Sequence, residues 1–153
     1  MKFKFPYENL LNNKKTLRDV AAREFSEAEV SFESSKKDLN SMYSQIEDTR
    51  KNSESIGQKR VIKAQDIELM KWADYFLEGQ KIRIQHQRQE LQKKNQALEE
   101  RREVLEKKAQ EFKIFEKLKS KMKDKFKDKQ KKLELKAIDE LVVMRAGRKS
   151  DNL

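Results

Sequence analysis

The chain has 153 residues, of which 42% are charged and 35% hydrophobic, and its formal net charge is +10. Too few apolar residues are present for an ordinary globular core, and three glycines and one proline leave few tight turns, so the composition favours long helices or coiled coil over a compact α/β or all-β domain. Cysteine is absent, which excludes disulfides and thiolate metal sites.

A first long helix is predicted from about residue 6 to residue 56. Pro6 is tolerated in the first turn of a helix, where its missing N–H costs little. Apolar and small residues then recur at alternating steps of three and four, a heptad pattern. The stripe comprises Ala21, Phe25, Ala28, Phe32, Ser35, Leu39, Met42, Ile46, Thr49, Ser53 and Ile56. Gly57 follows directly, a standard helix stop, so a break is expected at about 57–65.

A second long helix is predicted at about 66–146. Apolar residues repeat at seven-residue intervals and are interrupted only by Lys119. The series comprises Met70, Leu77, Ile84, Leu91, Leu98, Leu105, Phe112, Phe126 and Leu133. So narrow a stripe suits one helix packed on one partner. Gly147 ends the periodic region, and residues 147–153 are expected to fray.

Two long helices with one break predict an all-α fold, an antiparallel coiled-coil hairpin forming a single elongated domain over 1–153. With the tip at 57–65, residues whose numbers add up to about 125 face each other, and 116–145 are left largely unpaired. An alternative tip at 72–80 would pair the N-terminal aromatics with 126–144. The first register is favoured because the seven-residue series passes through Gly79 without a change of phase.

Residues 117–132, KLKSKMKDKFKDKQKK, form a lysine-rich segment with nine lysines, two aspartates and a charge of +7. Alternating lysines imitate a strand, but Leu118, Met122 and Phe126 are spaced by four, which indicates a helix. Three interpretations are open: a solvated helix face, a surface that docks on an acidic protein, or a site for nucleic acid or anionic lipid. No recognised nucleic-acid module or stacking platform supports nucleic acid.

No pattern of catalytic, cofactor-binding or metal-binding residues is visible, so we expect no enzyme and no cofactor. The single histidine, His86, has no cysteine to complete a metal site. Acidic residues interleave with Lys and Arg as in ion-paired helix faces, and a glycine-rich phosphate loop is missing. No apolar run reaches the length of a membrane span, and Lys2 and Lys4 precede no apolar segment, so a cytoplasmic protein is expected.

Aromatic residues gather at 71–79, KWADYFLEG. Trp72 and Phe76 are i,i+4 neighbours, while Tyr75 is rotated away from them. They either widen the hairpin near its tip or form an apolar docking patch, since aromatic residues anchor interfaces. In the favoured register Tyr43 lies near Ile82. Tyr75, Gly79, Ile82 and His86 share one helix face, because they are spaced by four, three and four residues. The predicted patch, drawn from both helices, comprises Tyr43, Tyr75, Ile82 and His86.

Three stretches together resemble the flagellar export protein FliJ family. KFKFPYENLL, residues 2–11, is similar to that family's opening, and ELKAIDELVVMR, residues 134–145, to its closing element. YFLEGQKIRIQHQRQEL, residues 75–91, is similar to the entry of its second helix. The resemblance spans nearly the whole chain, although the dense lysines and the small residues of the first stripe depart from the pattern.

The resemblance implies a non-enzymatic, cytoplasmic component of the flagellar type III export apparatus, associated with the inner face of the membrane at the flagellar base. It implies a stalk that engages the hexameric export ATPase ring, the export-gate membrane protein and substrate chaperones, without nucleic acid or a small-molecule substrate. The patch around Tyr43 and Tyr75 would contact the gate, and 117–145 would face the ring. Ring candidates are Lys121, Lys125, Phe126, Lys129, Asp139, Glu140 and Arg145. The rival interpretations are a generic coiled-coil spacer or scaffold, and a basic helix that binds an anionic surface.

Overall fold

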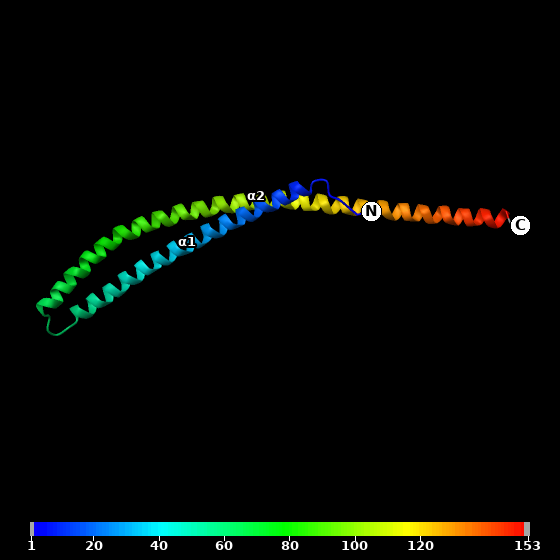
Figure 1. Ribbon diagram of the computed structural model, residues 1–153. Helices are drawn as coiled ribbons and strands as arrows, with labels where there is room; N and C mark the ends of the chain where they lie inside the picture. Colours follow the sequence, from blue (N-terminus) through cyan, green and yellow to red (C-terminus); the bar gives the residue numbers. More distant parts are fainter. Residues whose placement is uncertain (1, 152–153) are drawn as a thin grey trace. The chain divides into compact units, whose positions relative to one another are not determined.

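The computed structural model describes residues 2–151, and nearly all of them lie in two helices, α1 at Glu8–Gly57 and α2 at Ala64–Asp151 (Figure 1). No strand occurs among these residues. The predicted all-α helical hairpin is therefore confirmed. The chain divides into two compact units, which we describe separately. The hairpin unit is Val20–Glu106, and the terminal unit consists of the described parts of Met1–Asp19 and Lys107–Leu153.

In the hairpin unit, α1 and α2 lie side by side and run in opposite directions (Figure 1). The buried positions Ala21, Ser35 and Leu39 of α1 fall on the predicted stripe, as do Ile84 and Leu98 of α2. The core between the helices is therefore thin and contains small and polar residues beside its aliphatic ones.

Contacts across the hairpin unit fix its register. The Gln80 side-chain amide donates a hydrogen bond to the Gln45 amide oxygen (3.0 Å), and Arg101 pairs with Glu24 at 2.6 Å. Both pairs match the register expected for a tip at 57–65. Residues 72–80 lie inside α2, which excludes the alternative tip there.

Residues 58–63 connect the two helices. Gly57 is the last residue of α1, so the helix ends where its glycine stop was expected, although Gly57 does not adopt a positive φ. The start of α2 is held by Asp66, whose carboxylate accepts a hydrogen bond from the Lys63 backbone N–H (3.0 Å). An acidic residue at the third helical position commonly caps a helix in this way. This bond, with help from the nearby Lys59 ammonium, holds the pKa of the Asp66 carboxyl below its ordinary value.

In the terminal unit, the segment that precedes α1 packs against α2. Phe5 and Leu11 form a small buried core with Phe112, and the Phe3 ring lies 5.6 Å from the Phe126 ring between centroids. The extended N-terminal segment thus lengthens the pairing along α2 as far as Phe126. The expectation that α2 is largely unpaired from residue 116 onward is therefore wrong for its first part.

The end of α2 also differs from the prediction. The helix continues through Gly147 to Asp151, so the expected end at 146 and the fraying of 147–151 are wrong. Residues 152 and 153, the rest of the predicted frayed tail, lie outside the described part of the chain. Gly147 is exposed, and glycine inside an exposed helix costs only about 1 kcal/mol relative to alanine.

Candidate protein-binding surfaces

A helical chain of this kind can carry a metal site, a membrane-spanning helix, or exposed apolar or charged surfaces that bind a partner. Within residues 2–151, no group of three or more His, Asp and Glu side chains could hold a metal ion. None of the described helices combines the length and the apolarity needed to cross a membrane. The exposed surfaces of the two units remain as candidate sites.

Three of the four residues predicted to form one patch share the outward face of α2. Tyr75 and Ile82 are 75% and 61% exposed, and His86 is also exposed. At about 100° per residue, all three lie roughly 160–200° around α2 from the buried Ile84. They therefore point away from α1 and form a continuous exposed stripe.

Tyr43, the fourth residue, lies elsewhere. The Arg88 guanidinium donates a hydrogen bond from Nε to the Tyr43 hydroxyl (2.8 Å), and its carbon lies 5.6 Å from the centre of the tyrosine ring. Arg88 is only about 40° around α2 from the buried Ile84, so this contact lies at the edge of the helix interface. The prediction of one patch is therefore wrong in its geometry, because the four residues belong to two different surfaces.

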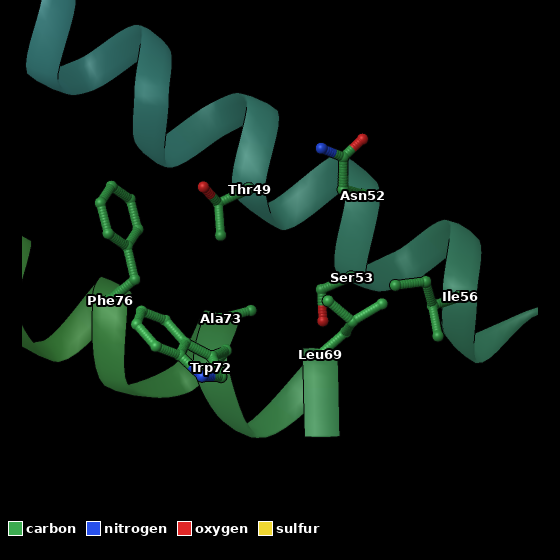
Figure 2. A pocket seen from close by; sticks show the side chains of 8 residues that line it. All are labelled: Thr49, Asn52, Ser53, Ile56, Leu69, Trp72, Ala73 and Phe76. Atoms are coloured by element: carbon green, nitrogen blue, oxygen red, sulfur yellow. The ribbon is translucent and has the colours of Figure 1, made fainter. Parts of the chain in front are cut away.

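The aromatic group near the connection is divided between the interior and the surface. A groove of about 250 Å³ opens between the end of α1 and the start of α2. Figure 2 shows the Phe76 ring directed toward α1, near Thr49, with Trp72 beside Ala73 on α2. Trp72 is largely exposed, whereas Phe76 is half-buried. Phe76 thus widens the hairpin as one interpretation predicted, and Trp72 remains accessible.

The N-terminal part of α1 is tied to α2 within the terminal unit by charged groups. Lys14 pairs with Glu111 at 3.0 Å, and Lys119 pairs with Glu8 at 3.0 Å. The hydrogen bond from Lys14, with Lys108 nearby, holds the pKa of the Glu111 carboxyl below its ordinary value. One lysine of the lysine-rich segment is thereby engaged inside the unit.

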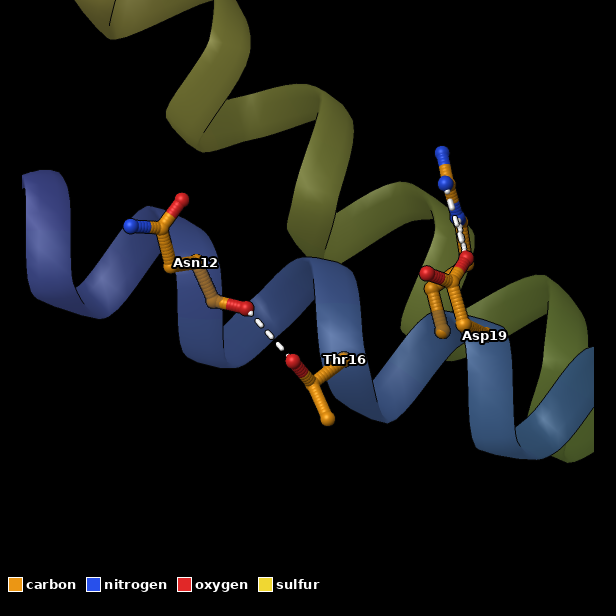
Figure 3. Close-up of polar contacts among 4 residues, drawn as sticks. Asn12, Thr16 and Asp19 are labelled. Atoms are coloured by element: carbon orange, nitrogen blue, oxygen red, sulfur yellow. Dashed lines mark hydrogen bonds and ion pairs between the residues drawn. The ribbon is translucent and has the colours of Figure 1, made fainter.

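This part of α1 also carries local side-chain contacts. The Thr16 hydroxyl donates to the Asn12 backbone carbonyl (3.0 Å), and Asp19 accepts from the neighbouring Arg18 (Figure 3). Such bonds satisfy polar groups within the helix. The same Arg18 lies 4.4 Å above the Phe112 ring, which adds a cation–π contact to the small core.

The predicted ring-facing residues are not alike in their exposure. Lys121, Lys125 and Lys129 are exposed and, spaced by four, lie along one side of α2. Phe126 is half-buried beneath Phe3, so it belongs to the packing of the terminal unit. The remaining candidates, Asp139, Glu140 and Arg145, are exposed.

The last part of α2, residues 133–151, is here called the C-terminal segment. Every residue in it is exposed, and its large apolar side chains are 55–70% exposed. They are Leu133, Leu135, Ile138, Leu141, Val142, Val143 and Met144. Large exposed apolar patches mark interaction sites, so this segment is a second candidate surface.

Comparison with protein families shows which family the chain belongs to. The family model described as "Flagellar FliJ protein" matches residues 3–151 of the chain. The chain belongs to the FliJ family. No curated protein and no solved structure matches it significantly. Membership makes this chain a component of the flagellar protein export apparatus, as the three sequence stretches implied.

In this FliJ-family chain, sequence reasoning selected the charged residues of the C-terminal segment and passed over its apolar ones. The signal was present, because Ile138 and Val142 are spaced by four and Leu135 precedes them on the same face. Asp66 was also missed, although an acidic residue three positions after a helix start is a recognised capping pattern.

Proposed function

We propose that this FliJ-family chain is a coiled-coil stalk that binds the hexameric export ATPase through its terminal unit. In this proposal the hairpin unit contacts the export-gate membrane protein and substrate chaperones, which places the chain at the inner face of the membrane at the flagellar base. The observation that carries the proposal is the C-terminal segment, a helix whose seven large apolar side chains are all exposed.

A binding partner for this segment is supported by its energetics. Burying one Val, Leu, Ile or Met side chain is worth about 1.5–3 kcal/mol, so several together can hold a helix in an apolar cavity. The lysine-rich segment precedes it on the same helix with a charge of +7. An assembly whose central cavity is apolar and whose rim is acidic would complement both segments, and the proposal expects these two features of the ATPase ring.

The exposed stripe of Tyr75, Ile82 and His86 supports a separate contact for the gate. Aromatic and aliphatic side chains that point away from the partner helix contribute nothing to the packing of the hairpin. Tyr43 is engaged by Arg88 and would contribute less. Tyr75→Ala/Ile82→Ala should therefore reduce capture of the gate protein's cytoplasmic part more than Tyr43→Ala does, and equal capture by both variants would contradict this assignment.

The ATPase contact is tested by measuring ATP hydrolysis and co-sedimentation of the export ATPase with and without the chain. Ile138→Ser/Val142→Ser should remove most of the stimulation of ATP hydrolysis and most of the co-sedimentation, because it removes two aliphatic side chains from the apolar face of the C-terminal segment. The control variant Val30→Ser/Val104→Ser also removes two exposed aliphatic side chains, but from the hairpin unit. It should behave as the unmodified chain.

Circular dichroism should show the same helix content in both variants, because all four substituted positions are exposed. If the unmodified chain neither stimulates nor co-sediments with the ATPase, the proposal fails and a coiled-coil spacer becomes the better interpretation. Equal loss in both variants would also contradict a specific role for the C-terminal segment.

A further inference from the structure

The connection between α1 and α2 exposes two adjacent aliphatic side chains. Val61 is 72% exposed and Ile62 is 48% exposed, and both lie at the end of the hairpin unit outside either helix. Basic residues flank them, with Lys59 and Arg60 on one side and Lys63 on the other. Val61 thus contributes little to the packing of the hairpin, and about half of the Ile62 surface remains open to solvent.

We propose that this connection binds the surface of an anionic lipid membrane. Val61 and Ile62 enter the headgroup region, and Arg60 and Lys63 contact the lipid phosphates. Apolar side chains beside Lys and Arg are the combination by which peripheral segments bind anionic bilayers. This contact is independent of the proposed ATPase contact, which involves the terminal unit.

The charge at the connection favours an anionic partner. No acidic residue lies within 58–63. The nearest buried carboxylate, Asp66, is turned back to cap α2 and is 3.4 Å from the Lys59 ammonium. It therefore offsets chiefly the charge of Lys59 and to a smaller extent that of Lys63. Arg60 and Lys63 are both exposed.

The shape of the connection favours a lipid surface over a protein partner. The aliphatic pair lies on the turn itself, and the nearby groove is lined by residues of the two helices instead. A protein would need a matching pocket for such a projecting turn, whereas a bilayer surface adapts to it. Leu69 and Trp72, both exposed, lie in the first turns of α2 and line this groove, and tryptophan is favoured at the level of the headgroups.

The absence of cysteine allows a reporter to be placed at the connection alone. Gln58→Cys in the full chain, labelled with an environment-sensitive dye, reports the polarity at the exposed start of the connection. Vesicles of phosphatidylglycerol and phosphatidylcholine should shift its emission to the blue, and vesicles of phosphatidylcholine alone should not. A dye at Ser34→Cys, exposed in the middle of α1, should show no shift with either vesicle.

Two variants of the labelled chain separate the contribution of the aliphatic side chains to vesicle binding from that of the basic side chains. Val61→Ser/Ile62→Ser should abolish the shift. Arg60→Gln/Lys63→Gln should weaken vesicle binding, as reported by the dye at position 58, about twenty-five-fold, at roughly fivefold per charge. Lys36→Gln/Lys37→Gln removes the same charge from exposed positions of α1 and should leave the shift unchanged. Unaltered melting temperatures would show that all variants fold.

The lysine-rich segment could also attach the chain to vesicles, and the reporter distinguishes this outcome. Co-sedimentation with anionic vesicles without a shift at position 58 would overturn the proposal, because the chain would then be attached elsewhere. A shift that persists in Val61→Ser/Ile62→Ser would overturn it as well.

Discussion

At the scale of single residues, Gln80 is the most unusual member of the hairpin core. It is 2% exposed, and while its amide N–H donates to Gln45, its own oxygen has no partner among the described residues. A buried acceptor without a partner costs about 1–3 kcal/mol. A polar residue that survives at such a position can specify register at the expense of stability, as buried polar residues do in coiled coils.

Gln80→Leu should therefore raise the free energy of unfolding by about 1 kcal/mol, since it removes the unsatisfied oxygen and adds apolar contact. Gln45 is exposed and can bond to water in the variant. Urea denaturation followed by circular dichroism measures the change, with the exposed Gln89→Leu as control. A less stable Gln80→Leu variant would show that the hydrogen bond of the buried amide contributes more to stability than the desolvation of the amide costs.

Asp66 and Glu111 make folding depend on pH. Both carboxyls have a pKa lowered in the folded chain, the first chiefly by the Lys63 backbone N–H and the second chiefly by Lys14. The ionised form is thus favoured by folding, so their contribution is fully present above the ordinary carboxyl pKa of about 4. It is lost as the pH falls through the lowered values.

Asp66→Asn should lower the melting temperature by a few degrees at neutral pH and match the unmodified chain in strong acid, where Asp66 is protonated in both states. Thermal melts by circular dichroism from neutral pH downward give the comparison. The exposed Glu29→Gln should run parallel to the unmodified chain. A difference between Asp66→Asn and the unmodified chain that is constant at every pH would mean that the carboxylate charge is irrelevant.

At the scale of the elements, both helices and their register could be predicted because burial recurs at a fixed spacing. Leu39 and Ile84 illustrate this, since each lies on a predicted stripe and is buried. The Phe3 and Phe5 contacts could not be predicted, because an extended segment has no helical period from which its partner can be inferred. The predicted end of the second helix at Gly147 was wrong because one glycine is tolerated in a solvated helix when its neighbours are good helix formers.

The candidate sites were less predictable than the helices. Helical spacing correctly placed Tyr75, Ile82 and His86 on one face, since that depends only on 100° per residue. It could not anticipate that Arg88 would reach across to Tyr43, because long side chains take positions that the backbone period does not determine. The assignment to the flagellar export apparatus came only from the family, because solvated helix faces of unrelated coiled coils are chemically alike.

At the scale of the whole chain, positive charge is strongly uneven. The lysine-rich segment carries +7 of the net +10, and one of its lysines is paired with Glu8. The apolar C-terminal segment follows it directly on α2. The two segments would contribute differently to binding, the first through screened electrostatics and the second through burial of apolar surface.

Lys121→Gln/Lys125→Gln/Lys129→Gln should weaken binding to the export ATPase at least tenfold at about 50 mM salt and have little effect at about 500 mM, where exposed charges are screened. Ile138→Ser/Val142→Ser should weaken binding by a similar factor at both salt concentrations, because apolar burial is not screened. Titration of the labelled chain with the ATPase, followed by fluorescence anisotropy, measures both affinities.

Lys36→Gln/Lys51→Gln/Lys81→Gln removes three exposed lysines of the hairpin unit and serves as the charge-matched control. Equal weakening by the two lysine triples would show that net charge alone attracts the partner, and that the lysine-rich segment has no specific place in the contact.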